Sequence, residues 1–561
     1  MLIKITNFSG MVPQQSLKQL PDNGAGLAKN TRLTGGALSA FRRRSLVKTL
    51  PANLLPYKSI YKFGQTRATA NITDDSIWFA YTEDTDTVRG QIFKDVTERT
   101  FFTNATRAAK TNTELAGTTG NLPNQYLSMG VPAPTATLTP TVATIGTGTA
   151  EDRYYVWTYV TSWGEESLPA LVNVPGAPIV VNPVGGVVQF PSLPGPTDNT
   201  SGITHVRVYR TSTGSTATDY QLVTLTLANG TKTTDAPIGS VNVKDATNSS
   251  ELAEVCPSLE WDAPPEGLLG LVNLPNGITV GFKDNTVYFS ESYRPYTYPE
   301  AYTQTVEFPI VGLGVIGATL VVLTRGNPYV MQGVDPSAIS VQKLDVQQAC
   351  VSKRSIVSMG FGVLYASPDG IVLVDGNGAR VITKDLFTVR EWRATNPETL
   401  TCCQYDGQYY GFWATGGFIL DPNNGNPIYS THDLTVSAVF NDTRSDSLYL
   451  VESNQIKKWE GDHTSYMPYT WRSKTFEVPH QTNFSVAQVL ADTYGGTTLN
   501  VYTRATASAE PVLRASITPT SDKPFRLPSG FMSKFWEFEL VGTDTVLSIF
   551  AANATTELVA V

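Results

Sequence analysis

A regular spacing of turns in the second half of the chain limits the possible folds most strongly. Five turns, spaced 38 to 47 residues apart, lead directly into an aromatic or aliphatic run; they begin at Asp284, Arg325, Pro368, Thr415 and Ser453. The clearest unit, residues 351–391, reads as four short strands with turns at 368–370 (PDG) and 375–378 (DGNG). A period near forty with four strands per unit is typical of β-propeller blades.

The same interpretation extends the repeat towards the N-terminus. Residues 76–103 contain two or three further strand-like runs, which suggests a propeller of six blades. The alternative is a meander sandwich whose hairpins happen to be evenly spaced. We predict an all-β fold with five parts: an N-terminal arm (1–50), a first propeller segment (51–131), an inserted sandwich (132–262), the remaining blades (263–465) and a C-terminal β-sandwich (466–561).

The composition is typical of a protein with many short strands, and its charge limits the kinds of partner that the protein can bind. The 561 residues include 45 glycines and 35 prolines spread along the chain. Charged residues make up only 16%, and the net charge is −8. A protein that grips nucleic acid must neutralise phosphates, so this balance argues against DNA binding. The charge balance is compatible with a channel wall along which DNA slides, because electrostatic repulsion keeps the DNA away from the wall.

The cysteines and the N-terminal residues give further limits. Cys256, Cys350, Cys402 and Cys403 have neither metal-binding nor disulfide spacing, so we expect reduced, small apolar side chains. The opening MLIKITNFSGM lacks the apolar core of a secretory signal, and no run approaches the length of a membrane span. We expect a protein that folds in a cytoplasm.

Residues 20–44 read as a strand, a glycine turn at 35–36 and a second strand, followed by a compact basic patch. The patch consists of Arg42, Arg43 and Arg44. One interpretation is a solvated strand edge that charge protects from further pairing. The other is a contact with an acidic partner surface or with nucleic-acid phosphates.

Two stretches resemble tail nozzle (tail tubular) proteins of short-tailed bacteriophages. The first is residues 20–44, where LPDNGAG leads into NTRLTGGAL; the second and stronger is residues 329–369, which begin YVMQGVDPSAISVQKLDVQQ. The resemblance implies a virion protein, a β-propeller subunit that assembles as a ring of six below the adaptor ring of the tail. It also implies an axial channel that holds and releases phage DNA without sequence-specific binding.

The composition changes at residue 131, where a Pro/Thr/Ala-rich linker leads to residue 150. The runs YVTSWGEES (159–167) and VRVYRTSTG (206–214) then resemble a fibronectin type III-like sandwich. Because propeller strands are expected on both sides, we predict an insertion that projects from the ring. By analogy with the tail architecture it would dock fibres or spikes.

A Tyr/Pro-rich loop follows at residues 290–302. Its rings, Tyr293, Tyr296 and Tyr298, would form a rigid amphipathic contact surface if they are exposed. The competing interpretation is that they cover the blade that they follow. Beyond residue 464 the blade rhythm ends, and alternating runs between 471 and 551 indicate the C-terminal sandwich.

Motifs for catalysis or metal binding are weak. His205, His432, His463 and His480 lie far apart, without metal-binding spacing. Residues 367–370 resemble a shortened sialidase Asp box and residues 421–425 a calcium loop without its closing glutamate, but plain turns explain both better. Glu165 and Glu166 are adjacent, so in a strand they would face apart rather than act as a glycosidase pair. We expect no enzymatic activity, no cofactor and no metal.

Two hypotheses of different classes result. The first is a structural ring subunit of a phage tail, which contacts its own copies, the adaptor ring and fibre or spike proteins. The second is a glycan-binding or glycan-degrading propeller similar to a tailspike. The lack of a recognisable acid/base or arginine cluster, together with the two stretches of resemblance, favours the first.

Overall fold

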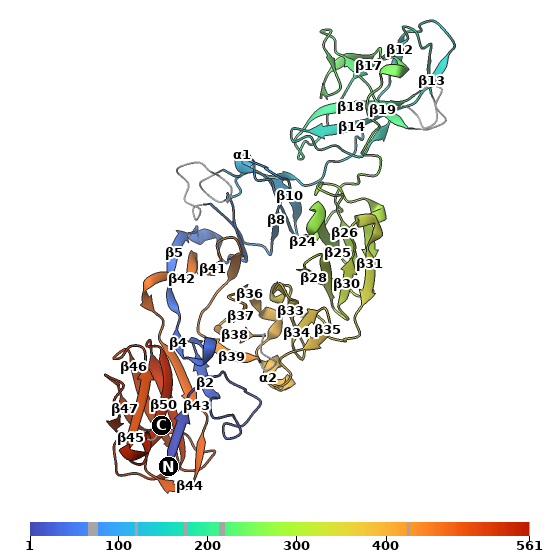
Figure 1. Ribbon diagram of the computed structural model, residues 1–561. Coiled ribbons are helices and arrows are strands. Elements are labelled where there is room, and N and C mark those ends of the chain that lie inside the picture. The colour runs from blue at the N-terminus through green and yellow to red at the C-terminus, as the bar shows by residue number, and fades with distance from the viewer. Residues whose placement is uncertain (65–76, 118–121, 173–177, 213–218, 423–426, 560–561) are drawn as a thin grey trace.

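A computed structural model describes residues 1–64, 77–117, 122–172, 178–212, 219–422 and 427–559 (Figure 1). The chain is mainly β, with 48% strand and 7% helix in many small antiparallel sheets, so the predicted all-β class is confirmed. The α-helices within these ranges are short: α1 (Thr113–Ala116), α2 (Val389–Ala394) and α3 (Thr555–Val559). No helix in the described part is long and apolar enough to span a membrane.

Antiparallel units of four strands make up the middle of the molecule. In sheet order they are β8 (Asp86–Arg89), β9 (Thr100–Asn104), β10 (Arg107–Thr111) and β11 (Leu127–Ser128); β24 (Leu269–Asn273), β25 (Thr279–Lys283), β26 (Thr286–Phe289) and β27 (Thr303–Thr305); β28 (Ile310–Ile316), β29 (Thr319–Thr324), β30 (Tyr329–Gln332) and β31 (Ser340–Lys343); β32 (Val357–Ser358), β33 (Val363–Ser367), β34 (Gly370–Asp375) and β35 (Gly378–Val381); β36 (Thr401–Tyr405), β37 (Gln408–Trp413), β38 (Gly416–Asp421) and β39 (Ile428–His432); β40 (Ala438–Asp442), β41 (Ser447–Glu452), β42 (Gln455–Tyr466) and β5 (Arg42–Thr49).

The predicted spacing of turns is confirmed. Each of the five turns joins the second and third strands of its unit, from the β25–β26 turn at Asp284 to the β41–β42 turn at Ser453. Both residues adopt positive φ, 53° and 54°. In the β37–β38 hairpin, Gly416 at the start of β38 has φ +141°, and a Cβ there would lie 2.6 Å from the carbonyl oxygen of His432. The four strands predicted within residues 351–391 are β32–β35.

The first strands of the units contact one another in cyclic order. β8 packs on β24, and β28, β32, β36 and β40 follow around the circle. β40 contacts β6 (Ser59–Lys62), which pairs with β7 (Trp78–Tyr81) in a two-stranded sheet. Ser59 Oγ closes the circle by accepting a hydrogen bond from the backbone N–H of Thr85, next to β8, at 2.9 Å. Of the predicted segment 76–103, Ser76 lies outside the described residues and the remainder holds β7, β8 and most of β9.

Residues 1–50, expected as an arm, add strands to three larger sheets and form a two-stranded sheet of β3 (Thr31–Arg32) and β4 (Ser39–Ala40). β1 (Leu2–Ile5) pairs with β50 (Val546–Ala552), and β5 pairs with β42. β2 (Ala25–Lys29) lies between β39 and β43 (Tyr469–Ser473), so it joins one unit of the circle to the C-terminal body in a ten-stranded sheet. The physical cause is apolar burial, because the side chains of this segment enter the C-terminal core.

The C-terminal body contains the strands that alternation predicted, and both chain ends lie in it (Figure 1). Its further strands are β44 (Phe476–Thr482), β45 (Val486–Ala491), β46 (Thr497–Arg504), β47 (Val512–Ile517), β48 (Phe525–Arg526) and β49 (Ser533–Gly542). One sheet runs β1-β50-β45-β48, and the other is the far part of the ten-stranded sheet. The sandwich therefore needs β1 and β2 in addition to the predicted residues 466–561.

Between β11 and β24 the chain forms a two-sheet body that projects from the circle (Figure 1). Trp157 and Phe190 are fully buried in its core. One sheet consists of β12 (Thr141–Thr144), β17 (Val187–Ser192), β23 (Val241–Asp245), β20 (Leu225–Thr226) and β21 (Lys232–Thr233). The other consists of β15 (Ala170–Leu171), β14 (Tyr155–Thr161), β18 (Ile203–Thr211) and β19 (Tyr220–Leu222), with β22 (Ala236–Pro237) on β18; β13 (Glu151–Arg153) and β16 (Ile179–Val181) pair separately. A buried ion pair between Lys110 of β10 and Glu165 anchors this insert to the circle.

Candidate functional site

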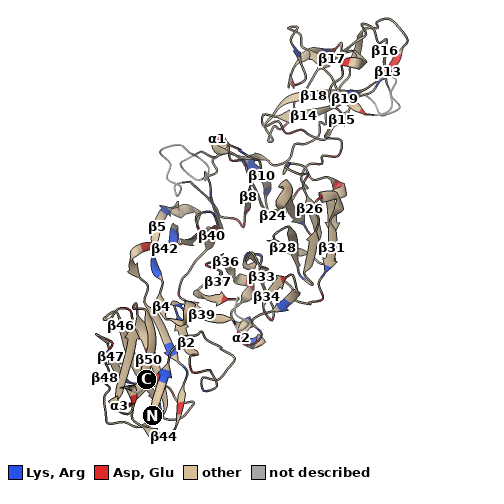
Figure 2. Cartoon of the chain, viewed as in Figure 1, with Lys and Arg blue, Asp and Glu red and all other residues tan. Residues whose placement is uncertain are grey.

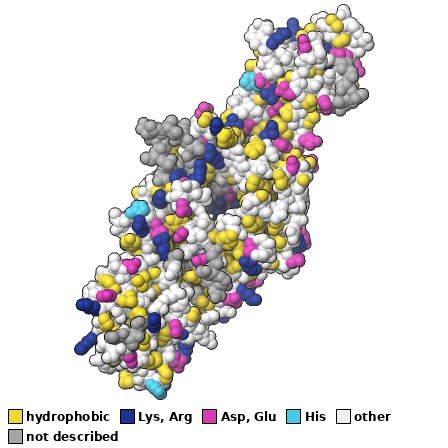
Figure 3. Space-filling view, in the orientation of Figure 1, with side chains coloured by type: hydrophobic (Ala, Val, Ile, Leu, Met, Phe, Trp, Pro, Cys, Tyr) yellow, Lys and Arg dark blue, Asp and Glu magenta, His cyan; other side chains and the backbone are white. Residues whose placement is uncertain are grey.

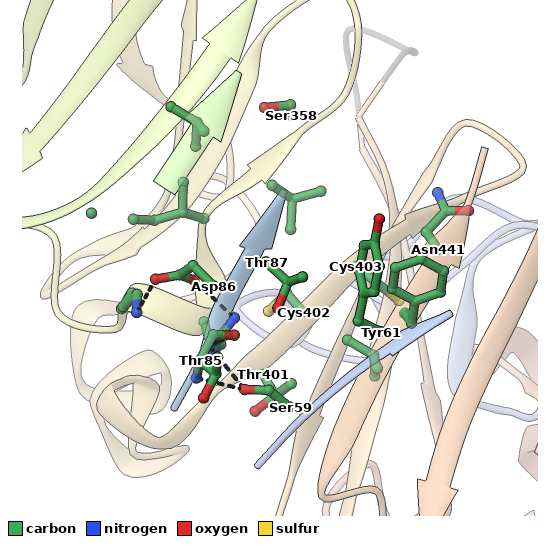
Figure 4. Close-up of a pocket in the computed structure, with 18 of the residues that line it drawn as sticks. Ser59, Tyr61, Thr85, Asp86, Thr87, Ser358, Thr401, Cys402, Cys403 and Asn441 are labelled. Atoms are coloured by element: carbon green, nitrogen blue, oxygen red, sulfur yellow. Dashed lines mark hydrogen bonds and ion pairs between the residues drawn. The ribbon is translucent and has the colours of Figure 1, made fainter. Parts of the chain in front are cut away.

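A pocket of about 410 Å³ lies inside the circle of first strands (Figure 4). Residues of β6, β8, β24, β28, β32, β36 and β40 line it. Each of these is an end strand of its described sheet, so its second backbone edge has no strand partner there. Free N–H and C=O groups at a sheet edge need other hydrogen-bond partners.

One side of the pocket is fixed by a cluster of four charged residues. Lys353 Nζ lies 3.2 Å from Asp84 Oδ2 and 2.5 Å from Asp86 Oδ2. Arg354 pairs with the same two carboxylates and donates to Ser59 Oγ at 3.1 Å. About one third of its side chain reaches solvent, but desolvation of the guanidinium lowers the Arg354 pKa to about 10, so it stays charged at neutral pH. The two positive and two negative charges of this cluster balance.

The opposite wall is neutral. Asn441 Nδ2 donates to the backbone oxygen and to Oε1 of Gln404, both at 2.7 Å. Asn441 Oδ1 is buried and has no hydrogen-bond partner among the described residues. Burial raises the pKa of the Tyr61 hydroxyl to about 12 and that of the Cys402 thiol to about 12, so both are protonated and neutral at physiological pH.

Sequence reasoning missed this site. The basic pair Lys353-Arg354 lies within the stretch used for the family resemblance, and Asp84 and Asp86 occupy alternate positions, just before and at the start of β8. That alternation, which puts two carboxylates on one face, was the available signal. The 270-residue separation between the pairs concealed their contact.

The predicted basic patch lies on β5, the end strand of its sheet (Figure 2). Arg42 contacts Glu460 and His463, and Arg44 forms a 2.7 Å ion pair with Glu452. Arg43 is exposed; its Nε donates to the carbonyl of Tyr466, and it forms no ion pair with any described residue. Arg42 and Arg44 therefore fix the edge strand, and Arg43 is the member available to a partner.

The three tyrosines separate into exposed and buried side chains. Tyr293 is 57% exposed and has positive φ of 60°. Tyr296 packs in the core of the insert against Trp261, and Tyr298 is 2% exposed. Neither buried ring offers a contact surface, because both fill space beneath the loop. For Tyr296 and Tyr298 the competing interpretation, that the rings cover neighbouring strands, is therefore the one that fits.

The other residues that the sequence suggested for catalysis or metal binding do not form a common site among the described residues. Glu165 contacts Lys110 and Glu166 contacts Arg207, so the adjacent carboxylates point to different partners. All four cysteines are free and buried, with Cys402 and Cys403 in different cores. Within the described ranges, no group of three His, Cys, Asp or Glu residues could hold a metal ion. Asn423, Asn424 and Gly425 of the possible calcium loop lie outside the described residues.

His432 is the one histidine deep in a described core, and it predicts a pH dependence. It is 4% exposed, and burial lowers its pKa to about 4. Between pH ~6.5 and ~4 the unfolded chain binds a proton that the native state does not. The free energy of unfolding therefore decreases by up to about 3 kcal/mol as the pH is lowered through this range. His432→Gln should flatten this slope in thermal unfolding measured from pH 7 to 4.5. The exposed control His480→Gln should keep it; an unchanged slope in His432→Gln would contradict the assignment.

No family model matches the chain, and no curated protein matches it.

Proposed function

We propose that this chain is a ring-forming nozzle subunit of a short-tailed phage tail, a structural virion protein. The observation that carries the proposal is the circle of four-stranded sheets, which agrees with the propeller subunit that the sequence resemblance implies; the projecting insert and the C-terminal body agree with the domains expected from the strand pattern. The first resembling stretch contains β2 and the start of β5, and the second contains β30–β33. These elements belong to the circle and to its junction with the C-terminal body.

The circle is proposed to be a β-propeller. Three features support this: four-stranded antiparallel units, first strands in cyclic contact, and a last unit completed by β5 from the opposite end of the sequence. The two-stranded sheet β6–β7 lies between the last and first units. The insert, with two sheets around one core, is proposed to be the fibronectin III-like module that docks fibres or spikes.

The DNA channel of this assembly is proposed to lie between subunits. The pocket inside one subunit's circle holds about 410 Å³ and is bounded on one side by the Lys353/Arg354–Asp84/Asp86 cluster, whereas duplex DNA is roughly 20 Å wide. The face shown in Figure 3 mixes basic, acidic and hydrophobic side chains without one continuous block of positive charge. A channel wall with a mixed surface of this kind would favour passage of DNA over binding.

Particle mass and symmetry test the proposal most directly. Mass photometry and negative-stain imaging of the purified protein, alone and with the adaptor ring, should show six copies of the 60.8 kDa chain, roughly 365 kDa, around an open axis. Formation of the ring only in the presence of the adaptor would support the proposal equally. A monomer or trimer that ignores the adaptor would overturn the proposal and favour the glycan-binding alternative.

The basic patch gives a sharper test of adaptor binding. Arg43→Glu should weaken co-purification with the adaptor ring and leave thermal stability unchanged, because Arg43 is exposed and forms no ion pair with the described residues. Arg44→Glu is the comparison: it places a carboxylate against Glu452 and should lower the thermal midpoint. Full adaptor binding by Arg43→Glu would exclude a role for this patch.

A further inference from the structure

We propose that the pocket inside the circle binds a neutral small molecule with several hydroxyl groups, of the size of a mono- or disaccharide. This site is independent of ring assembly and of the nozzle proposal. Its volume, about 410 Å³, lies in the range of small-molecule pockets.

The hydrogen-bonding demand of the pocket comes from the backbone. The unpaired edges of the first strands converge on it, and each edge presents N–H donors and C=O acceptors. A hydroxyl group both donates and accepts, so a polyhydroxylated ring satisfies such mixed edges from any orientation. A carboxylate or a phosphate offers acceptors only.

The charge balance selects a neutral ligand. Lys353 and Arg354 are paired with Asp84 and Asp86 within the cluster, and Lys58, the remaining charged residue of the lining, is exposed to water. A charged ligand would have to break these pairs and pay for desolvation.

The neutral wall supplies specific contacts. Asn441 Oδ1 is a buried acceptor without a partner among the described residues, and the amide is held in place by Gln404. Apolar side chains such as Ile60 and Leu313 line the pocket beside the strand edges. A sugar ring has the matching surface, since its C–H faces are apolar and its rim is polar.

Ligand-observed saturation-transfer NMR on the purified full chain tests this site. The probes are D-glucose, D-galactose and N-acetyl-D-glucosamine, with two comparators: D-glucuronate, similar in size but charged, and cyclohexanol, a ring with a single hydroxyl. At least one sugar should show transfer that exceeds both comparators. No transfer from any sugar, or equal transfer from cyclohexanol, would overturn the proposal.

Two variants locate the binding. Asn441→Ala should weaken binding of the responding sugar about five- to tenfold, as expected for one lost hydrogen bond. Thr401→Phe should fill the pocket and abolish binding. Asn285→Ala is the matched control, because its amide also donates to a backbone carbonyl but lies outside the pocket. Binding unchanged in both pocket variants, with thermal midpoints showing that they fold, would place the ligand elsewhere and contradict the inference.

Discussion

Removal of residues 1–9 is expected to unfold the C-terminal sandwich while the circle of sheets remains folded. The deletion takes away β1 and three core side chains, Ile3, Ile5 and Phe8, which are 7%, 1% and 2% exposed. Each buried side chain of this size contributes about 1.5–3 kcal/mol. Their sum is comparable with the entire stability of a domain.

Two further losses add to this effect. The Phe8 ring packs edge-on against Trp471 with centroids 4.8 Å apart, and the indole Nε1 donates to the carbonyl of Ser9 at 3.0 Å. Without β1, one backbone edge of β50 also loses its strand partner.

Hydrogen exchange at β45 and β50, measured in the truncated and full chains, checks this expectation. Protection should disappear in both strands of the truncated chain and persist in β33 and β34. Lys4→Ala is the control within the same strand, since this side chain is exposed and its removal should leave exchange unchanged. Retained protection in the truncated chain would show that residues 466–561 fold without the N-terminal strand.

Asp245→Ala should destabilise the insert by about 3–5 kcal/mol. The carboxylate is fully buried and lies 3.1 Å from Arg210 Nε and 3.8 Å from Arg153 Nη1, and it accepts a 2.7 Å hydrogen bond from Tyr155. The substitution leaves the Arg210 guanidinium buried without its carboxylate partner. Isolated buried charge is among the largest sources of destabilisation.

Limited proteolysis and thermal unfolding of the full chain measure this effect. Cleavage of Asp245→Ala should concentrate within the insert. Asp235→Ala provides the comparison: Asp235 is 41% exposed, and its partner Arg207 keeps a second ion pair with Glu166, so the cost should stay below about 1 kcal/mol. Equal destabilisation by the two substitutions would contradict the burial argument.

The parts of the fold that could be predicted from the sequence are those set by local geometry. Turn residues such as Pro368 and Asp284 indicate where a strand reverses, because positive φ and a fixed proline φ act within a few residues. Alternation with period two likewise indicated the strands of the C-terminal body. The separation of Cys402 and Cys403 onto different cores follows from the same period.

The candidate site was beyond this reasoning. The pocket is formed by strands that are spread over some 380 residues, and its charges meet only because the circle closes. The exposure of individual side chains could not be predicted from the sequence either. Tyr293, Tyr296 and Tyr298 lie in one loop with similar neighbours in sequence, yet two of them are buried. Burial depends on neighbours that are distant in the chain.

The sequence by itself therefore determined the strand class, the position of the repeated turns and the unreactive state expected of the cysteines. Only the tertiary structure decided that residues 1–50 complete three sheets, that Arg44 is already paired with Glu452, and that Lys353 and Arg354 meet Asp84 and Asp86. Turn chemistry and alternation are local properties of the backbone. Strand partners, burial and charge pairing depend on contacts between residues hundreds of positions apart.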